Sequence, residues 1–111
     1  DDYEWGWISG RGEKNPWMTV DLGRPETFDR ACLIDDPNDS PVRGFVIEAS
    51  DDGQAWREVV KGTTIGGRKD FKFEPVIARH ERLRITETKE NTGAVRINEF
   101  QLFSPEKNEG R

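Results

Sequence analysis

Apolar and polar residues alternate with a period of two in seven short stretches of the chain. These stretches cover residues 17–22, 28–34, 43–50, 56–61, 68–74, 81–88 and 95–103. Such alternation places successive side chains on opposite faces of a β-strand. No stretch shows the 3.6-residue repeat of an amphipathic helix, and no internal repeat is present. The pattern therefore predicts an all-β fold, an antiparallel β-sandwich in which each strand has an apolar inner face and a charged outer face.

Glycine, proline and short polar clusters separate the seven stretches. In "DDGQA" (51–55), aspartate hydrogen-bonds its own backbone and Gly53 takes the position with positive φ, so this segment is predicted to be a hairpin connection. We predict one domain over residues 1–104 and a tail or linker over residues 105–111. Because the sequence starts with Asp rather than Met, we interpret it as a mature fragment or as one module of a longer protein.

Strands that run alternately up and down would gather their connections at two opposite ends of the sandwich. One end would hold segments 8–16, 35–42, 62–67 and 89–94, and the other would hold segments 23–27, 51–55 and 75–80. The first end is much richer in hydrogen-bond donors and acceptors. Since binding residues concentrate on loops held by a rigid scaffold, we expect any ligand to bind at the first end.

Composition and charge exclude several classes of partner. The chain has 111 residues, of which 35% are charged and 32% hydrophobic, and its formal net charge is −5. No Lys/Arg cluster stands out that could face a phosphate backbone, so we expect no nucleic-acid partner. No apolar run is long enough to span a bilayer, and the loops are polar, so we expect no membrane insertion.

Catalytic residues are hard to assemble from this sequence. His80 is the only histidine and falls at the end away from the polar loops, while Cys32 lies within a strand and is interpreted as a small buried residue. The Asp pairs at 1–2, 35–36 and 51–52 are neighbours in the chain and should both stay ionised, unlike the acid pair of a glycosidase. We therefore expect no enzyme activity within this chain.

Four tryptophans are the main candidates for contact with a sugar ring. Trp17 and Trp56 begin strands and are interpreted as core residues. Trp5 and Tyr3 are predicted to be more exposed, in the unpatterned start "DDYEWGW". An exposed indole beside Arg and Asn side chains suits a saccharide, which offers an apolar C–H face ringed by hydroxyl groups.

Three stretches together resemble the discoidin, or coagulation-factor type C, domains, many of which are classed as carbohydrate-binding module family 32. They are "WMTVDLGRPETFDRACL", "VRGFVIEASDDGQAWREV" and "RLRITET" with "VRINEFQLF". The segments "GTTIG" and "FKFEPVIARHERLRITE" are similar to the C-terminal β-sandwich of α-L-fucosidases of glycoside hydrolase family 29. The resemblance implies a galactose-binding-domain-like jelly roll. It also implies a non-catalytic module of an extracellular or periplasmic enzyme whose catalytic acids lie in a separate domain.

The resemblance also implies candidate binding residues. Sugar binding is expected at the loop-rich end, with candidates Trp5, Asp36, Asn38, Arg43, Arg68 and Asn91. Members of the family that bind calcium use a loop before the first conserved Trp together with a Glu of the closing strand. In this sequence only "DDYEWGW" precedes that point, so we expect a shortened N-terminal strand. Asp1, Asp2 and Glu99 are the candidate ligands of a structural calcium, and no other cofactor is expected.

Three functional hypotheses remain open at this point. The first, which we favour, is a carbohydrate-binding accessory module of a glycosidase such as an α-L-fucosidase, with fucose- or galactose-containing glycans as ligands. The second is a structural module that supports the catalytic domain of its parent enzyme without binding sugar. The third is a discoidin-type module for protein binding or cell-surface adhesion.

Overall fold

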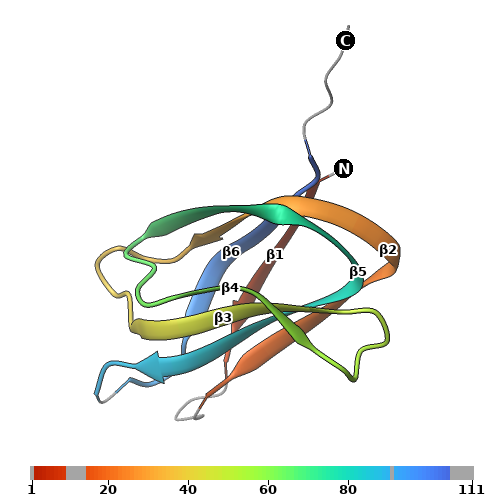
Figure 1. Ribbon diagram of the computed structural model, residues 1–111. Coiled ribbons are helices and arrows are strands. Elements are labelled where there is room, and N and C mark those ends of the chain that lie inside the picture. Colours follow the sequence, from red (N-terminus) through yellow and green to blue (C-terminus); the bar gives the residue numbers. More distant parts are fainter. Residues whose placement is uncertain (1, 10–14, 91, 106–111) are drawn as a thin grey trace, which may run out of the picture.

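A computed structural model describes residues 2–9, 15–90 and 92–105 as an all-β domain (Figure 1). It has six strands: β1 (Asp2–Ile8), β2 (Trp17–Ile34), β3 (Val42–Ser50), β4 (Arg57–Gly62), β5 (Arg68–Thr88) and β6 (Arg96–Phe103). Within these ranges no helix is long and apolar enough to cross a membrane. The predicted tail, 105–111, falls outside the described residues except for Pro105.

All six strands belong to one antiparallel sheet in the order β1-β6-β2-β5-β3-β4. β2 and β5 pair along most of their length, from Trp17 opposite Arg84 to Ile34 opposite Arg68. The second half of β2 also pairs with β6, and the second half of β5 also pairs with β3. Both long strands curve round at one end of the molecule, so that the sheet folds into two layers (Figure 1). The predicted antiparallel β-sandwich is confirmed.

The number of strands differs from the sequence prediction. Segments 17–22 and 28–34 form the single strand β2, and segments 68–74 and 81–88 form the single strand β5. The predicted turn at 23–27 is a bulge, because residues 22–25 of β2 lie opposite Arg79 alone. Gly23 takes a φ of 84° there and donates its N–H to Asp21 Oδ1 at 2.8 Å. A bulge bends its strand and increases its twist, which lets β2 pass from one layer to the other without ending.

The core lies between the two layers. Its largest fully buried side chains include Phe28, Leu33, Phe45, Ile47, Leu83, Ile85, Ile97 and Phe100. Strand β1 closes one edge of the sheet by pairing with β6, although its sequence shows no clear alternation of apolar residues. Its aromatic residues at positions 3, 5 and 7 pack against this core. The start of the described chain is therefore part of the sandwich.

Candidate functional site

Three of the four polar loops predicted to gather at one end of the sandwich meet there (Figure 1), and most of the fourth, 8–16, lies outside the described residues. The backbone N–H of Asp35 donates to the carbonyl of Gly67 at 3.0 Å, which joins the β2–β3 loop to the β4–β5 loop. The N–H of Lys89 donates to the carbonyl of Pro41 at 2.9 Å, which adds the β5–β6 loop. We call this end, residues 35–41, 63–67 and 89–94 without the undescribed position 91, the loop end.

Asp35 holds the loop end together from the inside. Only 2% of this residue is exposed, and both carboxylate oxygens accept hydrogen bonds. Oδ1 accepts the N–H of Gly67 at 2.7 Å, and Oδ2 accepts the Ser40 hydroxyl at 2.7 Å. The Ser40 Oγ in turn accepts the N–H of Gly66 at 3.2 Å. These contacts join residues about 30 positions apart, so the two loops form one rigid unit.

The glycine pair at the start of β5 is required by this arrangement. Gly66 and Gly67 have φ values of 60° and 95°, in the left-handed region that side chains rarely adopt. A Cβ on Gly67 would also lie 3.0 Å from the Cβ of Pro37. The "IGG" segment thus fixes the angle at which the chain enters β5 beside Asp35.

Two of the predicted sugar-binding residues lie exposed on the outer surface of the loop end. Asp36 Oδ1 accepts the N–H of Asn38 at 2.9 Å, and the Asp36 carbonyl accepts the N–H of Asp39 at 3.0 Å. This turn leaves the side-chain amide of Asn38 directed to solvent, because the residue is exposed and its own hydrogen bond uses only the backbone. Lys89 Nζ lies 3.4 Å from Asp39 Oδ1 across the loops.

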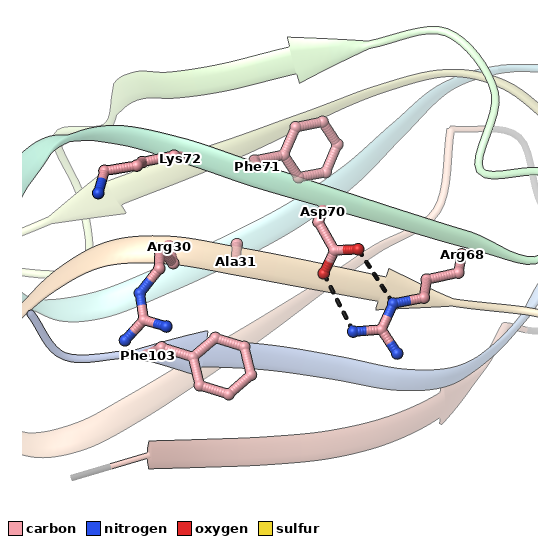
Figure 2. A pocket seen from close by; sticks show the side chains of 7 residues that line it. All are labelled: Arg30, Ala31, Arg68, Asp70, Phe71, Lys72 and Phe103. Atoms are coloured by element: carbon pink, nitrogen blue, oxygen red, sulfur yellow. Dashed lines mark hydrogen bonds and ion pairs between the residues drawn. The ribbon is translucent and has the colours of Figure 1, made fainter. Parts of the chain in front are cut away.

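The two predicted arginines have different surroundings. Arg43 Nη1 donates to the carbonyls of Ser40 and Val42 at 2.7 and 2.9 Å, so its guanidinium braces the loop end. Arg68 forms a two-point ion pair with Asp70, with N···O distances of 3.0 and 3.2 Å. It faces a groove on the outer surface of one layer (Figure 2). The remaining polar candidate, Asn91, lies outside the described residues.

The exposure predicted for the aromatic residues is wrong in both directions. Trp5 and Tyr3 are half-buried: their rings stack at 5.9 Å, and the Trp5 ring also lies 5.6 Å from that of Phe100. Trp17, interpreted as a core residue, is 58% exposed at the first position of β2. Trp17 directly follows Pro16, whose carbonyl accepts the N–H of Ile85. Trp17 therefore presents the exposed indole that was predicted at position 5.

Trp56 also does not pack into the core as predicted. Its ring lies 4.3 Å below the guanidinium carbon of Arg82, on the outer face of β5 and β3. Arg82 and Arg84 both donate to Glu48, at 2.9 and 3.2 Å. Burial raises the pKa of Glu48, but the hydrogen bonds from the two arginines outweigh this effect and lower the pKa below its usual value. The resulting cluster is a charged outer surface rather than part of the core.

Of the three calcium ligands implied by the resemblance, the structure describes the side chain of Glu99 alone. No group of three or more His, Cys, Asp or Glu side chains that could hold a metal occurs in that part of the chain. The register places Asp2 opposite Phe103, four positions along β6 from Glu99, which corresponds to roughly 13 Å. The Glu99 carboxylate instead accepts the side-chain amide of Gln101 at 2.9 Å. Asp1 and the side chain of Asp2 lie outside the described residues, so calcium binding stays a prediction.

The Asp51-Asp52-Gly53 segment at the opposite end is a hairpin connection, as predicted. Asp52 Oδ1 accepts the backbone N–H groups of Ala55 and Gln54 at 2.9 and 2.8 Å, and Gly53 has a φ of 80°. These hydrogen bonds, with one from Ser50, lower the pKa of Asp52 to about 2. Asp52 is therefore ionised and committed to the turn, which makes it unsuitable as a general acid.

The remaining titratable candidates lie away from the loop end. His80 belongs to β5 at the hairpin end, opposite Ser50 and next to Gly53. Cys32 is fully buried, and burial, reinforced by a hydrogen bond with Asp70, raises the pKa of its thiol to about 11. Burial likewise raises the pKa of Glu81, in the sandwich interior, to about 8. His80 at a strand end, Cys32 within a strand and Glu81 in the core thus do not come together in one site.

Comparison with protein families matches residues 1–100 to the F5/8 type C domain. The chain belongs to this family. The F5/8 type C domain described here is similar to chitosan-binding module 1 from a chitosanase/glucanase of Paenibacillus sp. IK-5, with 26% identity and a TM-score of 0.76. The match covers 89% of this chain and 76% of the module. Comparison with curated proteins gave no match.

Two further solved structures resemble this F5/8 type C domain. One is the family 32 carbohydrate-binding module of AlyQ in complex with 4,5-unsaturated mannuronic acid. It shows 25% identity and a TM-score of 0.71, with 92% of this chain and 78% of that chain covered. The other is a putative α-L-fucosidase from Bacteroides thetaiotaomicron VPI-5482. It shows 28% identity and a TM-score of 0.67, with 86% of this chain covered. The chain spans only about a fifth of the length of this fucosidase and of the similar SpGH29.

Proposed function

We propose that this F5/8 type C domain is a non-catalytic carbohydrate-binding module that binds glycans at its loop end. The observation that carries this proposal is the rigid loop end itself. Buried Asp35 fixes two loops together, while Asp36 and Asn38 present polar groups on their outer surface. Carbohydrate modules work through polar groups that are positioned before the ligand arrives, since ordering them on binding would cost affinity.

An exposed indole at the start of β2 supports the same function. Trp17 follows the segment that leads from β1 to β2, and its exposed ring could stack on the C–H face of a sugar. Thr19 and Arg84 lie on the same outer face, since Thr19 is two residues along β2 and Arg84 is the register partner of Trp17. We propose Trp17, rather than Trp5, as the aromatic contact.

The similar structures support a glycosidase context. A family 32 module and a chitosan-binding module share this fold at 25% and 26% identity. A putative α-L-fucosidase contains a segment that matches most of this chain and makes up 21% of the enzyme. We propose that the parent protein is a glycosidase of the α-L-fucosidase kind, acting outside the cytoplasm, and that the ligands are fucose- or galactose-containing glycans. Catalysis would then belong to another domain of that protein.

A titration followed by amide NMR tests this proposal. Fucosyl and galactosyl oligosaccharides should shift the amides of the loop end and the Trp17 indole, and leave the 51–55 hairpin unchanged. Asn38→Ala removes an exposed amide without touching the Asp35 network, so it should weaken binding while the fold stays intact. Gln54→Ala at the hairpin end is the matched control and should bind as the natural sequence does. Absence of shifts at the loop end with every glycan would overturn the proposal and favour a purely structural module.

A further inference from the structure

A second surface of this domain brings three cationic side chains together. It is a groove of about 370 Å³ on the outer face of the layer formed by β6, the second half of β2 and the first half of β5. Its lining includes Arg30, Arg68, Asp70, Phe71, Lys72 and Phe103 (Figure 2). Three of these six residues are cationic and one is acidic, although the whole chain has a net charge of −5. The residues that line the groove thus include more cations than acids, in contrast to the chain as a whole.

The register of three strands explains why these groups meet. Arg30 of β2 is the Cα partner of Lys72 on β5 and of Phe103 on β6, so it lies between them. Directly opposed residues on one face of a sheet have their Cβ atoms about 5 Å apart. The Lys72 ammonium, the Arg30 guanidinium and the Phe103 ring thus form one row across the sheet. Arg68 lies four residues earlier on β5, at the other end of the groove (Figure 2).

The two guanidinium groups are held in position by hydrogen bonds. Arg30 Nε donates to Asp29 at 3.2 Å, its Nη2 donates to the Ser104 carbonyl at 2.8 Å, and its guanidinium carbon lies 5.3 Å from the centre of the Phe103 ring. Arg68 is held by its ion pair with Asp70. Cations fixed in this way lose little conformational freedom when an anion binds between them.

Lys72 differs from both arginines. It is exposed and forms no ion pair with any residue in the described ranges. Asp29 pairs with Arg30 beside this row, Asp70 pairs with Arg68 at the other end of the groove, and Glu99 lies on the same face of β6. An anionic group would therefore be drawn chiefly to Lys72, next to the Arg30 guanidinium and the Phe103 ring.

We propose that this groove binds a saccharide that carries an acidic group, a carboxylate or a sulfate. The acidic group lies between Lys72 and Arg30, and the C–H face of the sugar ring packs on Phe103. This inference rests on the proposed function for the saccharide class of the ligand, but it places the ligand on the strands rather than on the loops. The two surfaces are separate and can be tested independently.

The test is an amide NMR titration with four probes: trigalacturonate, the corresponding neutral galactose trisaccharide, a sulfated disaccharide and inorganic sulfate. The acidic saccharides should shift the amides of residues 30, 72 and 103, and the neutral one should not. Lys72→Glu should weaken this binding about tenfold, because a favourable charge becomes unfavourable. The control Lys61→Glu makes the same change at an exposed lysine of β4 and should leave binding unchanged.

Each outcome decides a specific point. A response to only one of the acidic saccharides identifies the anionic group that the groove accepts. Binding of inorganic sulfate as tightly as of the saccharides would overturn the assignment, since the groove would then recognise an ion alone. Equal losses of affinity in Lys72→Glu and Lys61→Glu would also overturn it, as would the absence of any shift of the groove amides. If neutral glycans shift the loop-end amides and no saccharide shifts the groove amides, this inference is refuted and the proposed function stands. If acidic saccharides shift the groove amides and no glycan shifts the loop-end amides, only the loop-end site is refuted.

Discussion

Replacing Glu81 by Gln should remove most of the pH dependence of stability of this domain between about pH 5 and 8. Glu81 lies on β5 opposite Val20 of β2 and Ala49 of β3, and only 2% of it is exposed. Its Oε2 atom has no hydrogen-bond partner among the described residues. Burial raises the pKa of this carboxyl from 4.5 to about 8, against the opposing effect of the Arg57 charge. The folded protein therefore holds Glu81 in its protonated form at neutral pH.

The direction of the effect follows from proton binding. Because the pKa of Glu81 is higher in the folded protein than in the unfolded chain, the folded state binds the proton more tightly. Its contribution to stability is fully present below pH 4.5 and is lost as the pH rises through 8. At about 1.4 kcal/mol for each pH unit between the two pKa values, the loss amounts to roughly 5 kcal/mol. That is a large part of the unfolding free energy of a domain of this size.

Urea unfolding followed by tryptophan fluorescence at several pH values measures this loss. The natural sequence should lose stability steadily from about pH 5 to 8, and Glu81→Gln should not, since its amide does not ionise. The difference between the two should grow by several kcal/mol over this range. Glu58→Gln, at an exposed position of β4, should follow the natural sequence. A constant difference between the natural sequence and Glu81→Gln at all pH values would refute the reasoning.

Three further predictions concern single side chains. Asp35→Ala should destabilise the domain by about 2 kcal/mol in urea unfolding, because the N–H of Gly67 and the hydroxyl of Ser40 both lose their acceptor. An effect no larger than that of Asp36→Ala would contradict this. Trp17→Ala should change the unfolding free energy by no more than about 0.5 kcal/mol, since most of the indole is in solvent. Cys32, with its thiol buried and its pKa raised to about 11, should react with iodoacetamide at pH 7.5 only as fast as the domain unfolds, and rapid alkylation of the folded protein would show that the thiol is accessible.

Local sequence signals were sufficient wherever a single segment determines its own conformation. The hairpin connection at 51–55 was predicted correctly because Asp52 and Gly53 fix the turn through their own backbone. The gathering of the polar loops at one end followed from the alternating direction of the strands. The merging of two predicted strands into β2 was missed, because Gly23 and Pro25 signal a turn and a bulge equally well until the partner strand is known.

The alternation of residues in the first part of β2 predicts the exposure of Trp17. Met18, Val20 and Leu22 are the more buried positions of this part of β2, so strict alternation places Trp17 on the outside with Thr19 and Asp21. Its large apolar ring favoured the opposite interpretation.

The outer groove, in contrast, could not be found from the sequence. Arg30, Lys72 and Phe103 come from three strands, and only the register of β2 with both of its neighbours brings them into one row.

The sharing of β2 and β5 between the two layers also has a consequence for how the domain folds. Their pairing joins Trp17 to Arg84 and Ile34 to Arg68, residues far apart in the chain, and neither layer is complete without both strands. Chains dominated by such non-local pairing fold slowly, on the scale of about milliseconds to seconds. Because neither layer can detach alone, hydrogen exchange in β2 and β5 should report a single cooperative opening of the whole sandwich. Within a longer chain, this domain should therefore unfold in one cooperative step before a protease can cleave it or when a pulling force extends it.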